Sequence, residues 1–237
     1  DGGAFPGRID EEGGGAIQFN KSGGILTLSG NNRYSGGTYI ITGGAQATRQ
    51  ITLAGNNVLG TGPLVIRIAG ILTADASART VTNSISWENV NAGFTLGSNL
   101  AGALTLSGPL ALSGLADAQF TLPSDVVMSG PISSTSCGLQ VKDGPATLRL
   151  KNNTCSLIQA LNDPRISDGT MIMDGAVVTF ISGALVPNFR VQSLVTNGTA
   201  SLFITNNASL TVGNANGYGR LRLVDTASPT NSLGQCT

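Results

Sequence analysis

The side chains that could do chemistry in this chain are carboxylates and three cysteines, because the sequence contains no histidine. Without imidazole the chain cannot build a Ser-His-Asp type triad or a histidine metal site. Cleavage of a polysaccharide would need acidic side chains gathered on one face, alone or with a basic residue. The densest such group is Asp163-Pro164-Arg165 with Asp168, which could line a groove.

The other acidic residues are typical of turns and of a solvated surface. Other aspartates are scattered, mostly beside Gly, Pro or Ser, as expected of turn residues: Asp117, Asp125, Asp143, Asp174 and Asp225. The run Asp10-Glu11-Glu12 could be a calcium site or a carboxylate pair, but the alternating carboxylates of a calcium loop are missing. We interpret the run as a negatively charged end of the molecule, and we predict no catalytic residue, metal ion or cofactor.

The three cysteines leave two interpretations open. Cys137, Cys155 and Cys236 are either buried, inert thiols or one disulfide with a leftover thiol. In a chain of stacked coils, Cys137 and Cys155 would be about one coil apart, and stacked strands approach within the range of a disulfide. Cys137 and Cys155 are therefore the candidate disulfide, and Cys236 is the candidate intermolecular thiol.

The charge balance argues against nucleic acid as a partner. Thirteen basic and 13 acidic residues cancel, and charged residues make up 11% of the 237 residues. No basic excess is present to pair with phosphates. The uncharged stretch 89–116 is interrupted by glycines and polar residues, and its leucines alternate, so we predict strands there and no membrane span.

Short apolar runs that alternate with polar residues recur between Gly and Asn corners, which predicts an all-β chain. The clearest predicted strands are residues 25–28, 51–53, 64–66, 104–106, 110–112, 146–150, 177–180 and 208–212. The one short helix that the sequence suggests is Ser156 to Leu161. Four Asn-Asn pairs, beginning at residues 31, 56, 152 and 206, suit tight corners because Asn tolerates the left-handed region.

An internal repeat favours a β-solenoid over a β-sandwich or barrel. The segment Gly24–Ser35 returns with one deletion as Ala146–Ser156. No linker or change of composition separates the two halves. We therefore predict one continuous β-solenoid over residues 1–237, built of two long modules at about 1–121 and 122–237.

The segment Ser22–Thr38 resembles the autotransporter-associated β-helix repeat, also called the passenger-associated transport repeat. A weaker copy starts at Ser129, passes through Lys142–Leu148, and departs from the pattern at Cys155–Gln159. The resemblance implies a right-handed parallel β-helix in an exported bacterial protein, secreted or at the cell surface. It does not imply an activity.

We expect a non-catalytic structural protein: a rod that serves as a filament subunit or as an adhesin stalk. At about 20 residues per coil, the chain would form about eleven or twelve coils. The exposed strand edges at its ends favour a homo-oligomer through end-to-end or lateral stacking, and a surface glycan or protein is a candidate partner. The alternatives are a polysaccharide-active β-helix enzyme and a carbohydrate-binding module, although we expect Trp87 to be partly buried rather than a sugar platform.

Overall fold

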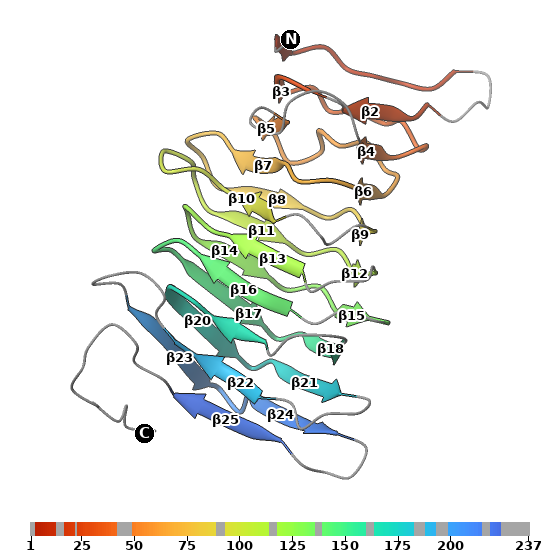
Figure 1. Ribbon diagram of the computed structural model, residues 1–237. Coiled ribbons are helices and arrows are strands. Elements are labelled where there is room, and N and C mark those ends of the chain that lie inside the picture. The colour runs from red at the N-terminus through yellow and green to blue at the C-terminus, as the bar shows by residue number, and fades with distance from the viewer. Residues whose placement is uncertain are drawn as a thin grey trace.

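The described residues form an all-β stack of 25 short strands in a computed structural model of the protein (Figure 1). The structure describes residues 3–12, 17–21, 23–41, 49–88, 93–113, 118–135, 139–159, 164–182, 188–192, 199–214 and 219–223. Every strand pair in it is parallel. The chain is therefore a parallel β-solenoid.

Three sheets form the faces of the solenoid. Sheet A has ten strands: β1 (Gly3–Phe5), β3 (Ile25–Leu28), β5 (Gln50–Leu53), β7 (Ile71–Ala74), β10 (Phe94–Leu96), β13 (Ala118–Thr121), β16 (Leu139–Asp143), β19 (Arg165–Ile166), β22 (Asn188–Val191) and β25 (Arg220–Leu223). Sheet B has nine: β2 (Phe19–Lys21), β4 (Thr38–Ile40), β6 (Leu64–Ile66), β9 (Ile85–Trp87), β12 (Leu110–Leu112), β15 (Ile132–Ser134), β18 (Thr154–Gln159), β21 (Val177–Ser182) and β24 (Ser209–Asn214). Sheet C has six: β8 (Arg79–Val81), β11 (Leu104–Leu106), β14 (Val126–Met128), β17 (Thr147–Lys151), β20 (Gly169–Asp174) and β23 (Ala200–Thr205).

About six successive turns carry a strand on all three faces, because sheet C starts only at β8. Within them the chain passes from sheet A to sheet C and then to sheet B. Leu104 pairs with Val126, and Val126 pairs with Leu148, so each of these turns takes 22 residues. The next turn of sheet C takes 23 residues, from Leu148 to Met171, and the one after it takes 31, from Met171 to Leu202. The expected eleven or twelve coils are not confirmed, since the turns are longer than the assumed length.

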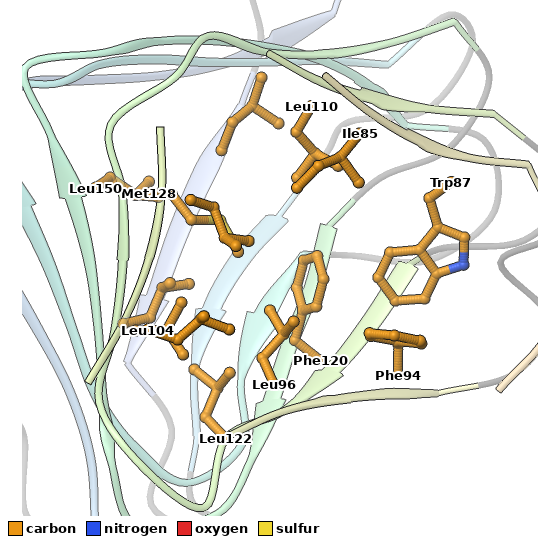
Figure 2. Close-up of a cluster of buried hydrophobic side chains, with 14 of the residues drawn as sticks. Ile85, Trp87, Phe94, Leu96, Leu104, Leu110, Phe120, Leu122, Met128 and Leu150 are labelled. Carbon is orange, nitrogen blue, oxygen red and sulfur yellow. The ribbon is translucent and has the colours of Figure 1, made fainter. Parts of the chain in front are cut away.

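The core is a set of apolar ladders, because alternate side chains of each strand point inward. Thr105 is half-buried between the buried Leu104 and Leu106, as the period-two pattern predicts. Figure 2 shows the middle of this core, where side chains from all three sheets meet. Trp87 is fully buried there, with its ring centroid 4.8 Å from that of Phe120. Trp87 was expected to be partly buried rather than a sugar platform; it is fully buried, so it is a core residue.

Asparagines at the corners tie one turn to the next. The side chain of Asn153 is buried, and its Nδ2 donates to the carbonyls of Met128 and Gly130, each at 3.1 Å. Asn83 donates in the same way to Gly60 and Gly62 of the preceding turn. These bonds satisfy backbone carbonyls that a corner removes from the sheets. The interior therefore holds ordered polar corners beside its apolar ladders.

The predicted role of Asn pairs in tight corners is confirmed in part. Three asparagines adopt the left-handed region: Asn152, Asn206 and Asn207, at φ values of 49°, 54° and 59°. Asn32, in the first pair, acts differently, because its buried Nδ2 donates to Val58 at 2.6 Å. Asn therefore stabilises a corner in one of two ways: through a left-handed backbone conformation, or through hydrogen bonds from its side-chain amide.

All eight predicted strands lie within or overlap observed strands. In the uncharged stretch the described residues form β10, β11 and β12, as predicted. The suggested helix at Ser156–Leu161 is wrong over its described part, because residues 154–159 form β18 and pair with β15 and β21. Stacking on two neighbours satisfies more backbone groups than one isolated helical turn would.

The two copies of the internal repeat occupy different faces. Ile25–Leu28 of the first copy is β3 of sheet A, whereas Thr147–Lys151 of the second is β17 of sheet C. The spacing of the copies is therefore not a whole number of turns. The division into modules at about 1–121 and 122–237 stays a prediction.

Candidate functional site

The last described turn exposes side chains that occupy core positions. Met173 is completely buried, while its register partner Ile204 in the last strand of sheet C is 47% exposed. Phe189 is 1% exposed, while its partner Leu221 in sheet A is 45% exposed. We call these residues the terminal apolar face; its members are Leu202, Ile204, Leu210, Val212 and Leu221, paired with buried residues of the preceding turn. No described strand pairs with the outer edges of β23, β24 and β25 (Figure 1).

The opposite end of the stack combines buried polar contacts with exposed apolar side chains, since Phe5 is 41% exposed although its register partner Leu28 is buried. Lys21 is 5% exposed, and its ammonium group donates to the carbonyls of Gly23 and Gly24. Burial lowers the pKa of Lys21. Its register partner is the buried Ile40, so a charged side chain takes an inward position in this turn. Both ends of the described stack thus expose an apolar side chain in register with the core, and the first end also buries a cation.

The acidic run near the N-terminal end binds backbone amides and an arginine. Oε1 of Glu11 accepts bonds of 2.6 Å from the amides of Ser35 and Ile17. The pKa of Glu11 is lowered, first by the bond from the Ser35 amide and then by that from Ile17. Asp10 forms an ion pair with Arg8. Glu11 therefore binds backbone amides, and Asp10 binds an arginine. Among the described residues, no three His, Cys, Asp or Glu side chains lie close enough together to form a metal site.

The group Asp163, Arg165 and Asp168 is described only in part, because Asp163 lies outside the described residues. Arg165 lies in β19, and its register partners on the two sides are Gln140 and Arg190. Oδ1 of Asp168 accepts a bond of 2.9 Å from the amide of Gly169. Asp168 thus holds the turn that leads into β20, as a turn aspartate is expected to do.

Further aspartates bind backbone or basic side chains, either between turns or within one turn. Asp125 accepts a bond of 2.8 Å from the amide of Thr147 in the next turn of sheet C. Asp75 pairs with Arg79 through two bonds of 2.6 and 2.8 Å. This pattern agrees with the interpretation of the scattered aspartates as turn residues. Asp117 and Asp225 lie outside the described residues, and so do not enter this comparison.

Asp174, the last residue of β20, joins three successive turns of sheet C. Its Oδ2 accepts a bond of 2.8 Å from Arg149 in the preceding turn. Its Oδ1 accepts a bond from the side-chain amide of Asn206 in the following turn. The Asn206 bond first, and the Arg149 bond second, lower the pKa of this carboxyl group.

Stability is expected to fall in acid as Asp174 becomes protonated. A lowered native pKa means that the ionised carboxylate stabilises the fold above the ordinary pKa of 3.8, and that this gain is lost as the pH falls through the native value. The Asp174→Asn variant cannot titrate at this position. Urea unfolding measures the free energy of unfolding of wild type and variant at neutral pH and at pH values below the ordinary pKa. The difference in this free energy between the two proteins should shrink in acid. A difference that is constant with pH would contradict this role.

A groove lies on the outer face of sheet C, next to Asp174. Its volume is about 520 Å³, and its lining residues are Thr105, Val127, Ser129, Arg149, Lys151 and Asn152. The strands β11, β14 and β17 supply its floor. The sequence carries one local signal for this groove: the alternation in Arg149-Leu150-Lys151, which puts both cations on the outer face of one strand. Their neighbours come from earlier turns, and no local pattern marks those turns as adjacent.

The cysteine predictions stay largely untested. Cys155 lies in the core, 1% exposed, and its register partners are Ile132 and Val178. Cys137 and Cys236 lie outside the described residues, so the disulfide and the intermolecular thiol remain predictions. Burial raises the pKa of the Cys155 thiol to about 12.

We expect Cys155 to resist alkylation in the folded protein. The thiolate is the reactive form, and with a pKa of about 12 almost none forms near pH 8. Brief treatment with iodoacetamide, with and without denaturant, followed by peptide mass spectrometry, measures labelling at this residue alone. Full labelling without denaturant would show that Cys155 is accessible and that its inward position is wrong.

Comparisons of the chain with models of protein families, with curated proteins and with solved structures found no match. Among the described residues no helix is long and apolar enough to cross a membrane.

Proposed function

We propose that this protein is a non-catalytic structural protein of the bacterial cell surface or extracellular matrix, in which a right-handed β-helical rod serves as a filament subunit or an adhesin stalk. The observation that carries the proposal is the stack itself. Sheet A joins β1 to β25 through consecutive parallel pairings, and the interior is a continuous apolar cluster. Such a structure sets a length and presents long faces, which is what a spacer needs. Right-handedness is favoured because crossover connections between parallel strands are right-handed in almost all proteins.

The proposed location rests on the repeat at Ser22–Thr38. Its resemblance to the autotransporter-associated β-helix repeat supports an exported bacterial protein, secreted or at the cell surface. Its first described strand, Ile25–Leu28, lies in sheet A and stacks between β1 and β5, so the segment supplies a rung of the solenoid. Only 11% of the residues are charged, and 33 of the 237 are glycine. The carboxylates described above serve turns, which supports a structural rather than a catalytic role.

Association with other copies is part of the proposal, and two surfaces could support it. The terminal apolar face would support end-to-end stacking, since it exposes residues at core positions. A lateral patch on sheet B consists of Ile158, Val177 and Ile181, which are 41%, 47% and 43% exposed. Ile158 and Ile181 are register partners, so this patch crosses two turns. We favour the terminal apolar face, because burying residues in core register also satisfies the open strand edges.

We expect Ile204→Lys to reduce self-association and the matched variant Ile181→Lys to leave it unchanged. Both replace an isoleucine of similar exposure, 47% and 43%, with the same cation. Ile204 belongs to the terminal apolar face, whereas Ile181 lies on the side of the rod. Sedimentation velocity over a range of concentrations measures the change. Loss of association only in Ile181→Lys would indicate lateral stacking, and a monomeric wild type would contradict the filament proposal.

A further inference from the structure

The sheet C groove combines three kinds of chemistry in one place. Arg149 and Lys151 supply positive charge, Thr105 and Ser129 supply hydroxyl groups, and Val127 supplies an apolar surface. Its volume of about 520 Å³ lies in the range of small-molecule sites, about 300–1,000 Å³. No aromatic side chain lines it, so stacking against the face of a neutral sugar is not what it offers.

Two cations line the groove, and two carboxylates lie beside it. Arg149 and Lys151 supply the positive charge, Asp174 is the register partner of Lys151, and the exposed Asp125 directly precedes β14. Asp174 accepts bonds from Arg149 and Asn206, and Asp125 accepts a bond from the backbone amide of Thr147. A guanidinium has five N–H donors, which is more than the bond to Asp174 uses. An incoming anion would therefore bind the ammonium group of Lys151 and the remaining donors of Arg149.

The groove runs along the axis of the solenoid. Thr105 pairs with Val127, and Val127 pairs with Arg149, so these outward side chains lie on three consecutive turns. Neighbouring turns are about 4.8 Å apart. A ligand that touches all three must extend parallel to the axis rather than around the rod. This geometry fits a unit of a linear polymer.

We propose that the sheet C groove binds an acidic polysaccharide through a hexuronate unit. The sugar carboxylate would bind Arg149 and Lys151, with hydrogen bonds that are stronger than those between neutral groups. The ring hydroxyls would bind Thr105, Ser129 and Asn152. The C–H groups of the ring would pack on Val127. The proposal does not depend on self-association, since the groove is built within one chain.

The test is calorimetric titration of the full chain with an oligogalacturonide at low ionic strength. Lys151→Ala removes an exposed cation that lines the groove, and we expect affinity to fall about tenfold, the loss of one charge-assisted bond. Val127→Glu puts a carboxylate on the groove floor and should abolish binding. Arg33→Ala is the matched control, because Arg33 is exposed and is not part of the groove. Its affinity should equal that of the wild type.

Several outcomes would overturn the proposal. They are a wild type that does not bind the oligogalacturonide, equal binding of a neutral oligosaccharide of the same length, and a Lys151→Ala variant that binds as tightly as wild type. Equal binding of inorganic phosphate would reduce the groove to a general anion site and would also overturn the assignment to a sugar. Circular dichroism of each variant separates loss of binding from loss of fold.

Discussion

Trp87→Ala is expected to lower the free energy of unfolding by about 3–5 kcal/mol. Trp87 is fully buried and lies edge-on to Phe94 and Phe120, with ring centroids 5.4 and 4.8 Å apart (Figure 2). Its neighbours come from the next two strands of sheet A, so the indole fills space between successive turns. Removing it leaves a cavity that rigid ladders cannot close. Chemical denaturation followed by circular dichroism measures the loss.

Trp87→Phe is the control for this prediction. It keeps an aromatic ring next to Phe94 and Phe120, so the loss should be clearly smaller than for alanine. If alanine and phenylalanine cost the same small amount, the side chain does not fill the core as the structure describes. Such a result would also question the stacking of β9 against the strands of sheet A.

Gly130→Ala is expected to cost about 3 kcal/mol, the upper part of the range for overpacking. A Cβ atom at Gly130 would lie 2.0 Å from the carbonyl oxygen of Gly108 in the preceding turn. A Cβ at Gly108 would in turn lie 1.9 Å from the carbonyl oxygen of Asn83. These three residues therefore stack backbone on backbone at one corner, and a methyl group there must push two turns apart. Thermal and urea denaturation measure the effect.

Gly213→Ala is the matched control, because a Cβ at Gly213 would meet nothing within 4 Å. The same substitution there should leave stability unchanged or slightly higher, since alanine restricts the unfolded chain more than glycine does. Equal stability of Gly130→Ala and Gly213→Ala would contradict the close approach of turns at the Asn83, Gly108 and Gly130 corner.

The strands could be predicted from the sequence because their signal is local. In Leu104-Thr105-Leu106 and Leu110-Ala111-Leu112, alternating apolar residues identify the inward side chains without reference to the rest of the chain. The internal repeat then indicated a stack of coils. It did not give the length of a coil, since the first strands of the two copies, Ile25–Leu28 and Thr147–Lys151, lie on different faces.

What could not be predicted depends on contacts between turns. The segment 156–159 is short and apolar, and its pairing with β15 and β21 decides that it is a strand. The sheet C groove needs Thr105, Val127 and Arg149 to stack, and their spacing follows from the lengths of corners. The inward position of Cys155 is likewise a matter of register, with Ile132 and Val178 beside it.

Electron microscopy of the native, purified protein, with and without reductant, tests the central claim most directly. The account predicts long rods with a regular axial repeat, joined at the terminal apolar face that contains Ile204 and Leu221. Shortening by reductant would indicate a disulfide between copies, for which Cys236 is the candidate. Isolated, compact particles in both conditions and at every concentration would contradict a self-assembling structural rod.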